Sequence, residues 1–385
     1  MAHAPITLGS GGGYGSDDCT GTLDYVVSGK TVIAKDSDDE PGTGRMTVNS
    51  LLSFSLAAYS GRRVLAKWQN PKAATGRPYS GVYIRYSTSG YPGKTGGTQI
   101  YKGAGSNTSS GGQSQAYLDL PALSTKYYLS IYPYVTCSVN GVASELTGTV
   151  INATVTTSAP LRVVIKSDQT YTIPSGYKKM DICAVGGGEA GFAGDGYKGS
   201  EQGWSEGGPG GDGGEVVNVL DISISEGQQI AAIIGAGGTS KTKGPGSTTV
   251  TRNGVTLATA RGGYGSSGGD GGYLSENSKN GYIRSPEKGS DGVRAFGDSN
   301  ETQYGPGGGG AAATGMYFGE REGAAGGKTG GGKGGNAGPS CTNGADGTAN
   351  TGAGGGGQAN YVNVTDHFWG GIGKGGSGVV VLRLR

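Results

Sequence analysis

The sequence predicts an all-β protein divided into an N-terminal segment (1–50), an antiparallel β-sandwich (51–158) and a C-terminal glycine-rich domain (159–385). Three observations predict this. Short apolar runs alternate with polar residues or are rich in β-branched residues, and no run has the period of a convincing amphipathic helix. Clusters of turn-forming residues separate the runs. Glycine is distributed unevenly, with 22 of the 84 glycines in residues 1–160 and 62 in residues 161–385.

The glycine content is roughly three times the usual fraction of about 7%. Collagen requires glycine at every third position together with abundant proline, whereas this chain has only 14 prolines and no sustained period. Disorder that is driven by charge requires far more than the 16% of charged residues found here. The glycines therefore call for another structural explanation.

Charge and residue usage exclude several classes of function. The formal net charge of +2 provides no global field for nucleic acid or for an anionic membrane. No apolar run approaches the ~20 residues of a membrane span, and the start of the sequence lacks the basic and apolar regions of a signal peptide. The four scattered cysteines are expected to be free thiols of a protein made in a reducing cytosol. With only two histidines, His3 and His367, we expect no metal and no other cofactor.

The N-terminal segment carries a short acidic run at Asp36, Asp38, Asp39 and Glu40. Its spacing loosely suggests a calcium loop, but the bidentate glutamate that an EF-hand places at position 12 is missing. A solvated turn is the better interpretation of this run.

The middle region contains strand-like runs that end at turns. The segments WQNP, GVYIRYSTSGYP and LDLPALSTKYYLSIYPY resemble a fibronectin type III domain. The resemblance implies that Trp68 is the core tryptophan of the second strand and that Tyr127 is the corner tyrosine, with Tyr128 as a possible substitute because the preceding turn is short. It implies a fold and a spacer role, and no chemistry.

The glycine-rich domain begins and ends with strand-like runs, Leu161 to Ile165, Met180 to Val185 and Gly378 to Leu384. Between them, the run from Val216 to Ile224 alternates, with Leu220, Ile222 and Ile224 on one face. A later run turns at Asn253-Gly254, which is a strong hairpin signal.

The glycine runs interrupt good strands and do not form one terminal tail, so we expect order and not disorder. Fixing a glycine costs roughly 0.5–1 kcal/mol more than fixing an alanine, so ordered runs must form something that only glycine permits. Polyglycine-II-like helices, which repeat every three residues and pack through their backbones, meet this requirement. Short three-residue phases do occur, at Gly188, Gly191 and Gly194 and again at Gly332, Gly335 and Gly338.

The frame of this domain resembles the glycine-rich domain of bacteriophage tail fibres and adhesins. The resemblance rests on TYTIPSGYKKMDICAVGGGEAG, on GGEVVNVLDISISEGQQIAAIIGAGG and on the terminal GGIGKGGSGVVVLRLR. The segment SDDCTGTLDYVVSGKTVIAKDSDDEPGTG is similar to phage tail proteins of bacteria with Gram-positive type walls. Together they imply a tail-fibre or receptor-binding protein of a phage or of a phage-tail-like bacteriocin.

This resemblance implies partners and a location. The N-terminal segment would dock on phage tail or baseplate proteins, and the glycine-rich domain would bind a bacterial cell-surface receptor, either a polysaccharide or a protein. The protein would be a virion component made in the host cytoplasm, and a homotrimer as fibres often are, with no nucleic-acid partner and no membrane insertion. The alternative is a structural minor tail protein that contacts no receptor.

No motif predicts an enzyme. The sequence GGGEAG at 186–191 fits a dinucleotide fingerprint, but no helix can follow it. Catalysis by a serine, histidine and aspartate triad would need His367, and no nucleophile elbow accompanies it. Paired carboxylates of a sugar-cleaving depolymerase stay open, although no β-helical repeat is visible.

Large aromatic residues that stand isolated in the glycine-rich region are the candidate receptor-binding residues. A planar ring buries much area at small entropic cost, which suits carbohydrate or protein surfaces. Trp204 is one such isolated ring, and for about half of these rings the alternative is that they fill gaps between glycine helices. The predicted receptor-binding residues are Tyr264, Tyr273, Tyr282, Tyr304, Tyr317, Phe318, Phe368 and Trp369.

Overall fold

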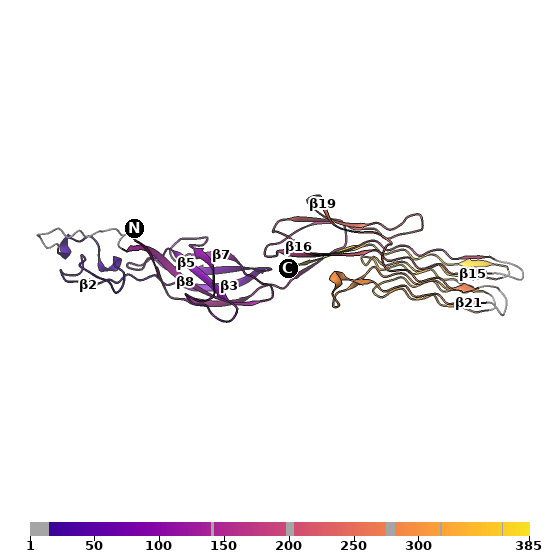
Figure 1. The fold of residues 1–385 in the computed structure, drawn as a ribbon, viewed down its shortest axis with the longest axis horizontal. Coiled ribbons are helices and arrows are strands. Elements are labelled where there is room, and N and C mark those ends of the chain that lie inside the picture. The colour runs from indigo at the N-terminus through magenta and orange to yellow at the C-terminus, as the bar shows by residue number, and fades with distance from the viewer. Residues whose placement is uncertain (1–14, 140–141, 198–203, 275–281, 316–317, 364) are drawn as a thin grey trace. The chain divides into compact units, whose positions relative to one another are not determined.

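The computed structural model describes residues 15–139, 142–197, 204–274, 282–315, 318–363 and 365–385. The chain forms two compact units, Met1–Pro160 and Leu161–Arg385 (Figure 1). Among the described residues the helical elements are three single-turn 3-10 helices, and all other regular elements are strands. The predicted all-β class is confirmed.

The first described part of the N-terminal unit is a small irregular structure. Two single turns, η1 (Ser16–Asp18) and η2 (Leu23–Tyr25), precede the two-stranded sheet of β1 (Thr31–Val32) and β2 (Gly42–Thr43). The acidic run lies between these strands in a turn, in which Asp38 and Asp39 have φ angles of 49° and 61°.

The rest of the N-terminal unit is a sandwich of two antiparallel sheets. One sheet has the order β3-β4-β7, and the other has the order β10-β8-β5-β6, with β9 also paired to β8. The strands are β3 (Ser53–Ser60), β4 (Arg63–Gln69), β5 (Gly81–Ser87), β6 (Thr98–Gly103), β7 (Gln113–Asp119), β8 (Lys126–Val139), β9 (Val142–Thr147) and β10 (Ile151–Thr156). Alternate residues of both sheets point inward, so that Val64 and Trp68 face Ile84, Leu129 and Ile131 in one core.

Two aromatic residues of this core also satisfy polar groups. Trp68 is buried, and its indole N–H donates to the Oδ1 atom of Asn70 at 3.1 Å. Tyr127 is buried, and its hydroxyl accepts a hydrogen bond from the backbone N–H of Ala122 at 2.9 Å. Tyr128 is only partly buried and lies under the ammonium group of Lys126. Tyr127, and not Tyr128, therefore ties the start of β8 to the preceding turn.

Of the three four-stranded antiparallel sheets in the described part of the C-terminal unit, two contain the strand-like runs predicted from the sequence. The first has the order β11-β27-β13-β16 and the second has the order β12-β17-β18-β19. Their strands are β11 (Leu161–Ile165), β12 (Gln169–Thr172), β13 (Lys179–Val185), β16 (Val216–Ser223), β17 (Gln229–Ile233), β18 (Thr248–Arg252), β19 (Val255–Ala260) and β27 (Val379–Leu384). The last strand, β27, pairs between β11 and β13, so that the predicted framing strands form one sheet.

One predicted strand differs from its expected pattern. The alternation was predicted to put Leu220, Ile222 and Ile224 on one buried face, but Leu220 is exposed. The pairing of β13 with β16 shifts between Met180 and Ile182, and Asp221 opposite this bulge has a φ of 60°. A bulge changes which side chains face the core, so Leu220 leaves the face that Ile224 occupies.

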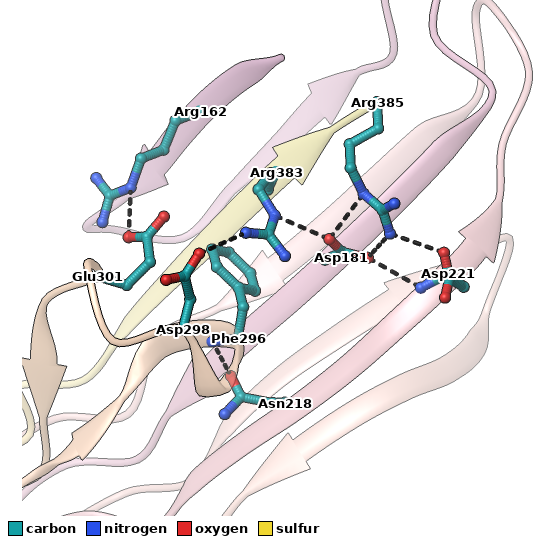
Figure 2. Close-up of polar contacts among 9 residues, drawn as sticks. All are labelled: Arg162, Asp181, Asn218, Asp221, Phe296, Asp298, Glu301, Arg383 and Arg385. Carbon is teal, nitrogen blue, oxygen red and sulfur yellow. Dashed lines mark hydrogen bonds and ion pairs between the residues drawn. The ribbon is translucent and has the colours of Figure 1, made fainter.

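A network of charges covers the first sheet (Figure 2). Asp181 on β13 is fully buried and accepts hydrogen bonds from Arg383 at 2.9 Å and from Arg385 at 2.7 Å, both from the last residues of the chain. Burial by itself raises the pKa of Asp181. The hydrogen bonds from Arg385, from the backbone N–H of Asp221 and from Arg383 lower it by a larger amount, so the pKa lies below its usual value.

The same network holds a connecting loop against the sheet. This loop contains β22 (Val293–Arg294), η3 (Ala295–Gly297) and β23 (Gln303–Tyr304). The guanidinium of Arg383 lies 4.4 Å from the ring centre of Phe296 and 3.6 Å from Asp298, as Figure 2 shows.

The glycine runs form a bundle of extended segments joined by main-chain hydrogen bonds. The segments are 186–194, 207–215, 262–272, 286–291, 305–313, 321–328, 331–338, 342–348, 352–360 and 370–378. Hydrogen bonds recur every three residues. The N–H groups of Gly188 and Gly191 donate to the carbonyls of Gly376 and Gly373, and those of Gly332 and Gly335 donate to Gly354 and Gly357. The three-residue phases seen in the sequence are therefore the phases of this bonding.

Two segments lie inside the bundle, 305–313 and 352–360. The segment 352–360 exchanges main-chain hydrogen bonds with 186–194, 207–215, 305–313, 331–338, 342–348 and 370–378. The segment 305–313 exchanges them with 207–215, 262–272, 286–291, 321–328, 331–338 and 352–360. These two segments carry the four-glycine runs at 307–310 and 354–357, where an added Cβ at every position would overlap a neighbouring backbone.

The close approach of the backbones explains the glycines. A Cβ atom placed on Gly308 would lie 2.0 Å from the carbonyl oxygen of Gly355, and one on Gly356 would lie 1.9 Å from that of Lys333. Outer segments instead place a larger residue at every third position, as at Pro209, Asp212 and Glu215, which are less buried than the glycines between them.

Candidate functional site

The turns between glycine segments alternate between two ends of the bundle. Neighbouring segments in the sequence run in opposite directions, because the hydrogen bonds that join them are antiparallel. In Figure 1 the strands β15 and β21 lie at the end of the unit remote from β16 and the C-terminus. This remote end, called the tip below, comprises the described residues 195–197, 204–206, 273–274, 282–285, 314–315, 318–320, 339–341, 361–363 and 365–369.

Two small sheets build the tip. The first has the order β14-β15-β20-β21, and the second has the order β24-β25-β26. Their strands are β14 (Asp195–Tyr197), β15 (Trp204–Glu206), β20 (Tyr273–Leu274), β21 (Ile283–Arg284), β24 (Ala313–Gly315), β25 (Asn360–Val362) and β26 (His367–Trp369). Strands β15 and β20 lie against β24, and β14 and β15 lie against β25, so the two sheets pack on each other.

A buried asparagine joins the two sheets. The side-chain amide of Asn360 donates to the carbonyl oxygens of Asp195 and Glu206, and its Oδ1 atom lies 2.5 Å from Nε2 of His367. The hydroxyl of Ser205 donates to the carbonyl of Asn360. His367 is thus a partner of a structural amide.

The structure brings five of the predicted receptor-binding residues to the tip. They are Tyr273, Tyr282, Phe318, Phe368 and Trp369. Trp369 is 60% exposed, Tyr282 and Phe368 are also exposed, and Tyr273 and Phe318 are half-buried. Tyr317 lies outside the described residues.

Two predicted residues lie at the opposite end. Tyr304 is only 6% exposed and packs with Cys183, Val379 and Val381, so the prediction that its ring is available on a loop is wrong. Tyr264 is 66% exposed, but it precedes Gly265, which is bonded to Gly213 beside the start of β16. Both rings lie near the strands from which the glycine segments start. The criterion used on the sequence, an isolated aromatic residue, does not distinguish this position from a loop at the tip.

The set of predicted residues omitted two rings on the first tip sheet. Tyr197 is 62% exposed and is the cross-strand partner of Trp204. Trp204 in turn stacks with Tyr273, with ring centres 6.4 Å apart and an interplanar angle of 30°. The sequence did contain a signal for these two rings. Successive glycine segments run in opposite directions, so the inserts that follow the first and the third segments, beginning at residues 195 and 273, start at the same end of the bundle.

Charged side chains border these rings. Arg284 lies 4.0 Å from a carboxylate oxygen of Glu206 and 4.0 Å from one of Asp270. Asp195 is exposed beside them. Within the described ranges, no three His, Cys, Asp or Glu side chains gather as a metal site requires. The tip thus places rings and hydrogen-bonding side chains next to one another on short paired strands.

Comparisons with known proteins identify the glycine-rich part. No helix in the described part of the chain is long and apolar enough to cross a membrane. A search of curated proteins finds no match to the chain. The family model of the glycine-rich domain matches residues 164–385, which is more than half of the chain. The protein therefore belongs to the glycine-rich domain family.

Proposed function

We propose that the protein is a tail-fibre or receptor-binding protein of a bacteriophage, or of a phage-tail-like bacteriocin, and that it attaches the particle to a bacterial surface through the tip. The observation that carries this proposal is that several inserts between glycine segments emerge at one end of a rigid bundle and present exposed rings there. Function commonly lies on loops that a rigid scaffold positions.

The glycine segments would be polyglycine II helices. In support, their hydrogen bonds recur every three residues, and a helix of this type has three residues per turn and packs through its backbone. Such helices leave one position in three on an outer segment free for any side chain. The scaffold can thus stay constant while the tip varies.

The sandwich of the N-terminal unit would be a fibronectin type III-like spacer. In support, its sheets β3-β4-β7 and β10-β8-β5-β6 follow that topology. Trp68 lies in the second strand, and the Tyr127 hydroxyl bonds to the backbone five residues upstream in the manner of a tyrosine corner. Residues 1–50 would dock on the tail or baseplate, and three copies would form the fibre.

Binding of the full-length protein to bacterial cells tests the proposal. Fluorescently labelled protein is incubated with a panel of strains, and bound protein is measured by flow cytometry. A variant in which six of the described tip rings are replaced by alanine should bind at least about tenfold more weakly, because aromatic residues often dominate interface energies. The replaced residues are Tyr197, Trp204, Tyr273, Tyr282, Phe368 and Trp369.

The matched control is Tyr264→Ala, which removes an equally exposed ring at the other end of the bundle. It should bind as the wild type does. Equal binding by the stripped variant would show that the tip is not the receptor surface. If the wild type binds no strain, and antibodies to the tip do not reach it on intact particles, the protein is a structural tail component instead.

A further inference from the structure

The outer face of the first tip sheet carries an ordered set of side chains. Asp195, Glu206, Tyr273 and Arg284 are successive cross-strand partners on its four strands. The neighbouring row on this face pairs Tyr197 with Trp204. The row between them contains Gly196, Ser205, Leu274 and Ile283. Ser205 and Leu274 are buried against the second sheet, and since side chains alternate across a strand, the other two rows face outward.

The rings on this face form a continuous aromatic surface. Trp204 stacks with Tyr273 across β15 and β20, and Tyr197 lies opposite Trp204 on β14. All three side chains project from paired strands that continue directly into the hydrogen-bonded bundle. Their positions are therefore fixed before any ligand arrives, which lowers the entropic cost of binding.

The charges beside the rings indicate which ligands fit. Three carboxylates, on Asp195, Glu206 and Asp270, accompany one guanidinium, on Arg284. Carboxylates accept hydrogen bonds from hydroxyl groups, and the guanidinium donates to ring and hydroxyl oxygens. Because these described groups carry a net negative charge, they repel polymers that contain phosphodiesters or uronic acids.

A protein partner fits this face less well. The central parts of protein interfaces are depleted of charged residues. Here, by contrast, three of the four residues in the row Asp195, Glu206, Tyr273 and Arg284 are charged, and the outward rows contain no aliphatic side chain among the described residues. Rings with interleaved hydrogen-bonding groups match the alternating apolar faces and hydroxyl edges of a sugar chain.

We infer that the outer face of β14-β15-β20-β21 binds a neutral glycan chain, with sugar rings stacked on Tyr197, Trp204 and Tyr273 and hydroxyl groups bonded to Asp195, Glu206 and Arg284. This inference rests on the proposed function and specifies its receptor class. The inference does not include Phe368 in the glycan-binding face. Phe368 lies between His367 and Trp369 on β26, so its side chain lies on the opposite side of the second sheet from theirs.

The experiment uses the full-length protein on a strain that it binds. Cells are treated with periodate, which cleaves sugar diols, or with a protease, which removes surface proteins. Binding should fall by at least about tenfold after periodate and stay within about twofold after protease treatment, because the receptor is a glycan. Purified cellohexaose, laminarihexaose or chitohexaose should compete for binding, and poly(glycerol phosphate) should not.

Variants place the site within the tip. Trp204→Ala with Tyr273→Ala should lower binding by about tenfold or more, and Tyr264→Ala, the matched control with an exposed ring at the opposite end of the bundle, should leave it unchanged. Tyr197→Ala is the second variant, because this ring is 62% exposed and its removal leaves the folded core intact. Thermal unfolding of each variant is compared with that of the wild type before binding is measured.

The results separate this inference from the proposed function. If binding is lost after protease and retained after periodate, the receptor is a protein, and the inference is wrong although the tip still binds cells. The same conclusion follows if Tyr197→Ala and the Trp204→Ala, Tyr273→Ala double variant bind normally while the variant with six tip rings replaced by alanine does not. If the wild type binds no cells, the proposed function fails. In that case the inference survives only if one of the three hexasaccharides changes the tryptophan fluorescence of the wild type but not that of Trp204→Phe.

Discussion

The sandwich and the glycine bundle are two all-β solutions to the same problem of filling an interior. In the sandwich, side chains do this, since Trp68, Ile84 and Leu129 are fully buried between two sheets. In the bundle, backbones do it, because the segments 305–313 and 352–360 are surrounded by other main chains. The sandwich is therefore stabilised mainly by buried apolar area, and the bundle mainly by satisfied peptide groups.

This difference determines where each region tolerates change. A sandwich core accepts apolar replacements of similar volume. The interior of the bundle accepts no added atom at most positions, whereas its outer positions, such as Pro209, Asp212 and Glu215, already carry larger side chains. A surface that must vary while its support stays constant is better placed on the bundle. This contrast leads to four predictions, beginning with the largest expected effect.

Gly356→Val should prevent folding of the C-terminal unit. The added Cβ would lie 1.9 Å from the carbonyl oxygen of Lys333, and no rotamer can relieve an overlap with backbone. We expect a loss of more than about 4 kcal/mol, the range in which single substitutions are exceptional. Gly332→Val and Gly335→Val should act in the same direction. Limited proteolysis with mass spectrometry should show cleavage after residue 160 and an intact sandwich.

The control for this prediction is Gly244→Val, because a Cβ at Gly244 has no atom within 4 Å. It should resist proteolysis as the wild type does. If both glycine variants behave alike, close backbone packing does not hold the bundle together.

Trp68→Ala should destabilise the sandwich by about 3–5 kcal/mol, since it removes a fully buried ring and leaves a cavity. The glycine-rich unit should keep its stability, because its interior contains no part of this core. Thermal unfolding followed by circular dichroism and by proteolysis of each unit measures both effects. Equal destabilisation of the two units would contradict the division of the chain at Pro160.

Asp181→Asn should lower the stability of the C-terminal unit by about 3 kcal/mol, because removing one partner of a buried ion pair leaves the other charges uncompensated. The guanidinium groups of Arg383 and Arg385 would lose the carboxylate that both contact. Asp298→Asn, at an exposed position of the same network, is the matched control and should have a much smaller effect. Urea unfolding distinguishes the two, and equal effects would show that burial of the carboxylate is unimportant.

Acid should weaken the bundle through Asp291. Its Oδ1 atom accepts hydrogen bonds from the backbone N–H of Lys328 and from the ammonium of Lys288, which lower its pKa to about 2. Because the folded pKa lies below the usual aspartate value of 3.8, the stabilisation is present above pH ~4 and is lost as the pH falls towards 2. Asp291→Asn should remove this part of the pH dependence of the melting temperature. An unchanged pH profile in that variant would mean that other carboxylates cause the acid sensitivity.

Much of the architecture followed from local patterns in the sequence. Alternating and β-branched runs predicted the framing strands, and Asn253-Gly254 predicted the hairpin between β18 and β19, where both residues have positive φ angles. The spacing of Gly188, Gly191 and Gly194 predicted a three-residue period. These features depend on residues near one another in the chain, so a single sequence is enough to reveal them.

The placement of the rings was only partly predictable. Isolated aromatic residues in glycine-rich sequence identified Tyr273, Tyr282 and Trp369, which do reach the tip. The same criterion selected Tyr304, which is buried, and it omitted Tyr197, which is exposed. Whether a ring reaches the tip depends on the end of the bundle at which its segment turns, and that depends on the directions of all the preceding segments.

What the sequence by itself determined is the class of the fold and the period of the glycine segments. Only the tertiary structure decided which segments are neighbours. It placed Asp181 next to Arg383 and Arg385, and Trp204 next to Tyr273. The physical reason is that glycine carries no side chain to specify a partner, so many pairings satisfy the same hydrogen bonds locally. The choice among them comes from the strands and turns that connect the segments.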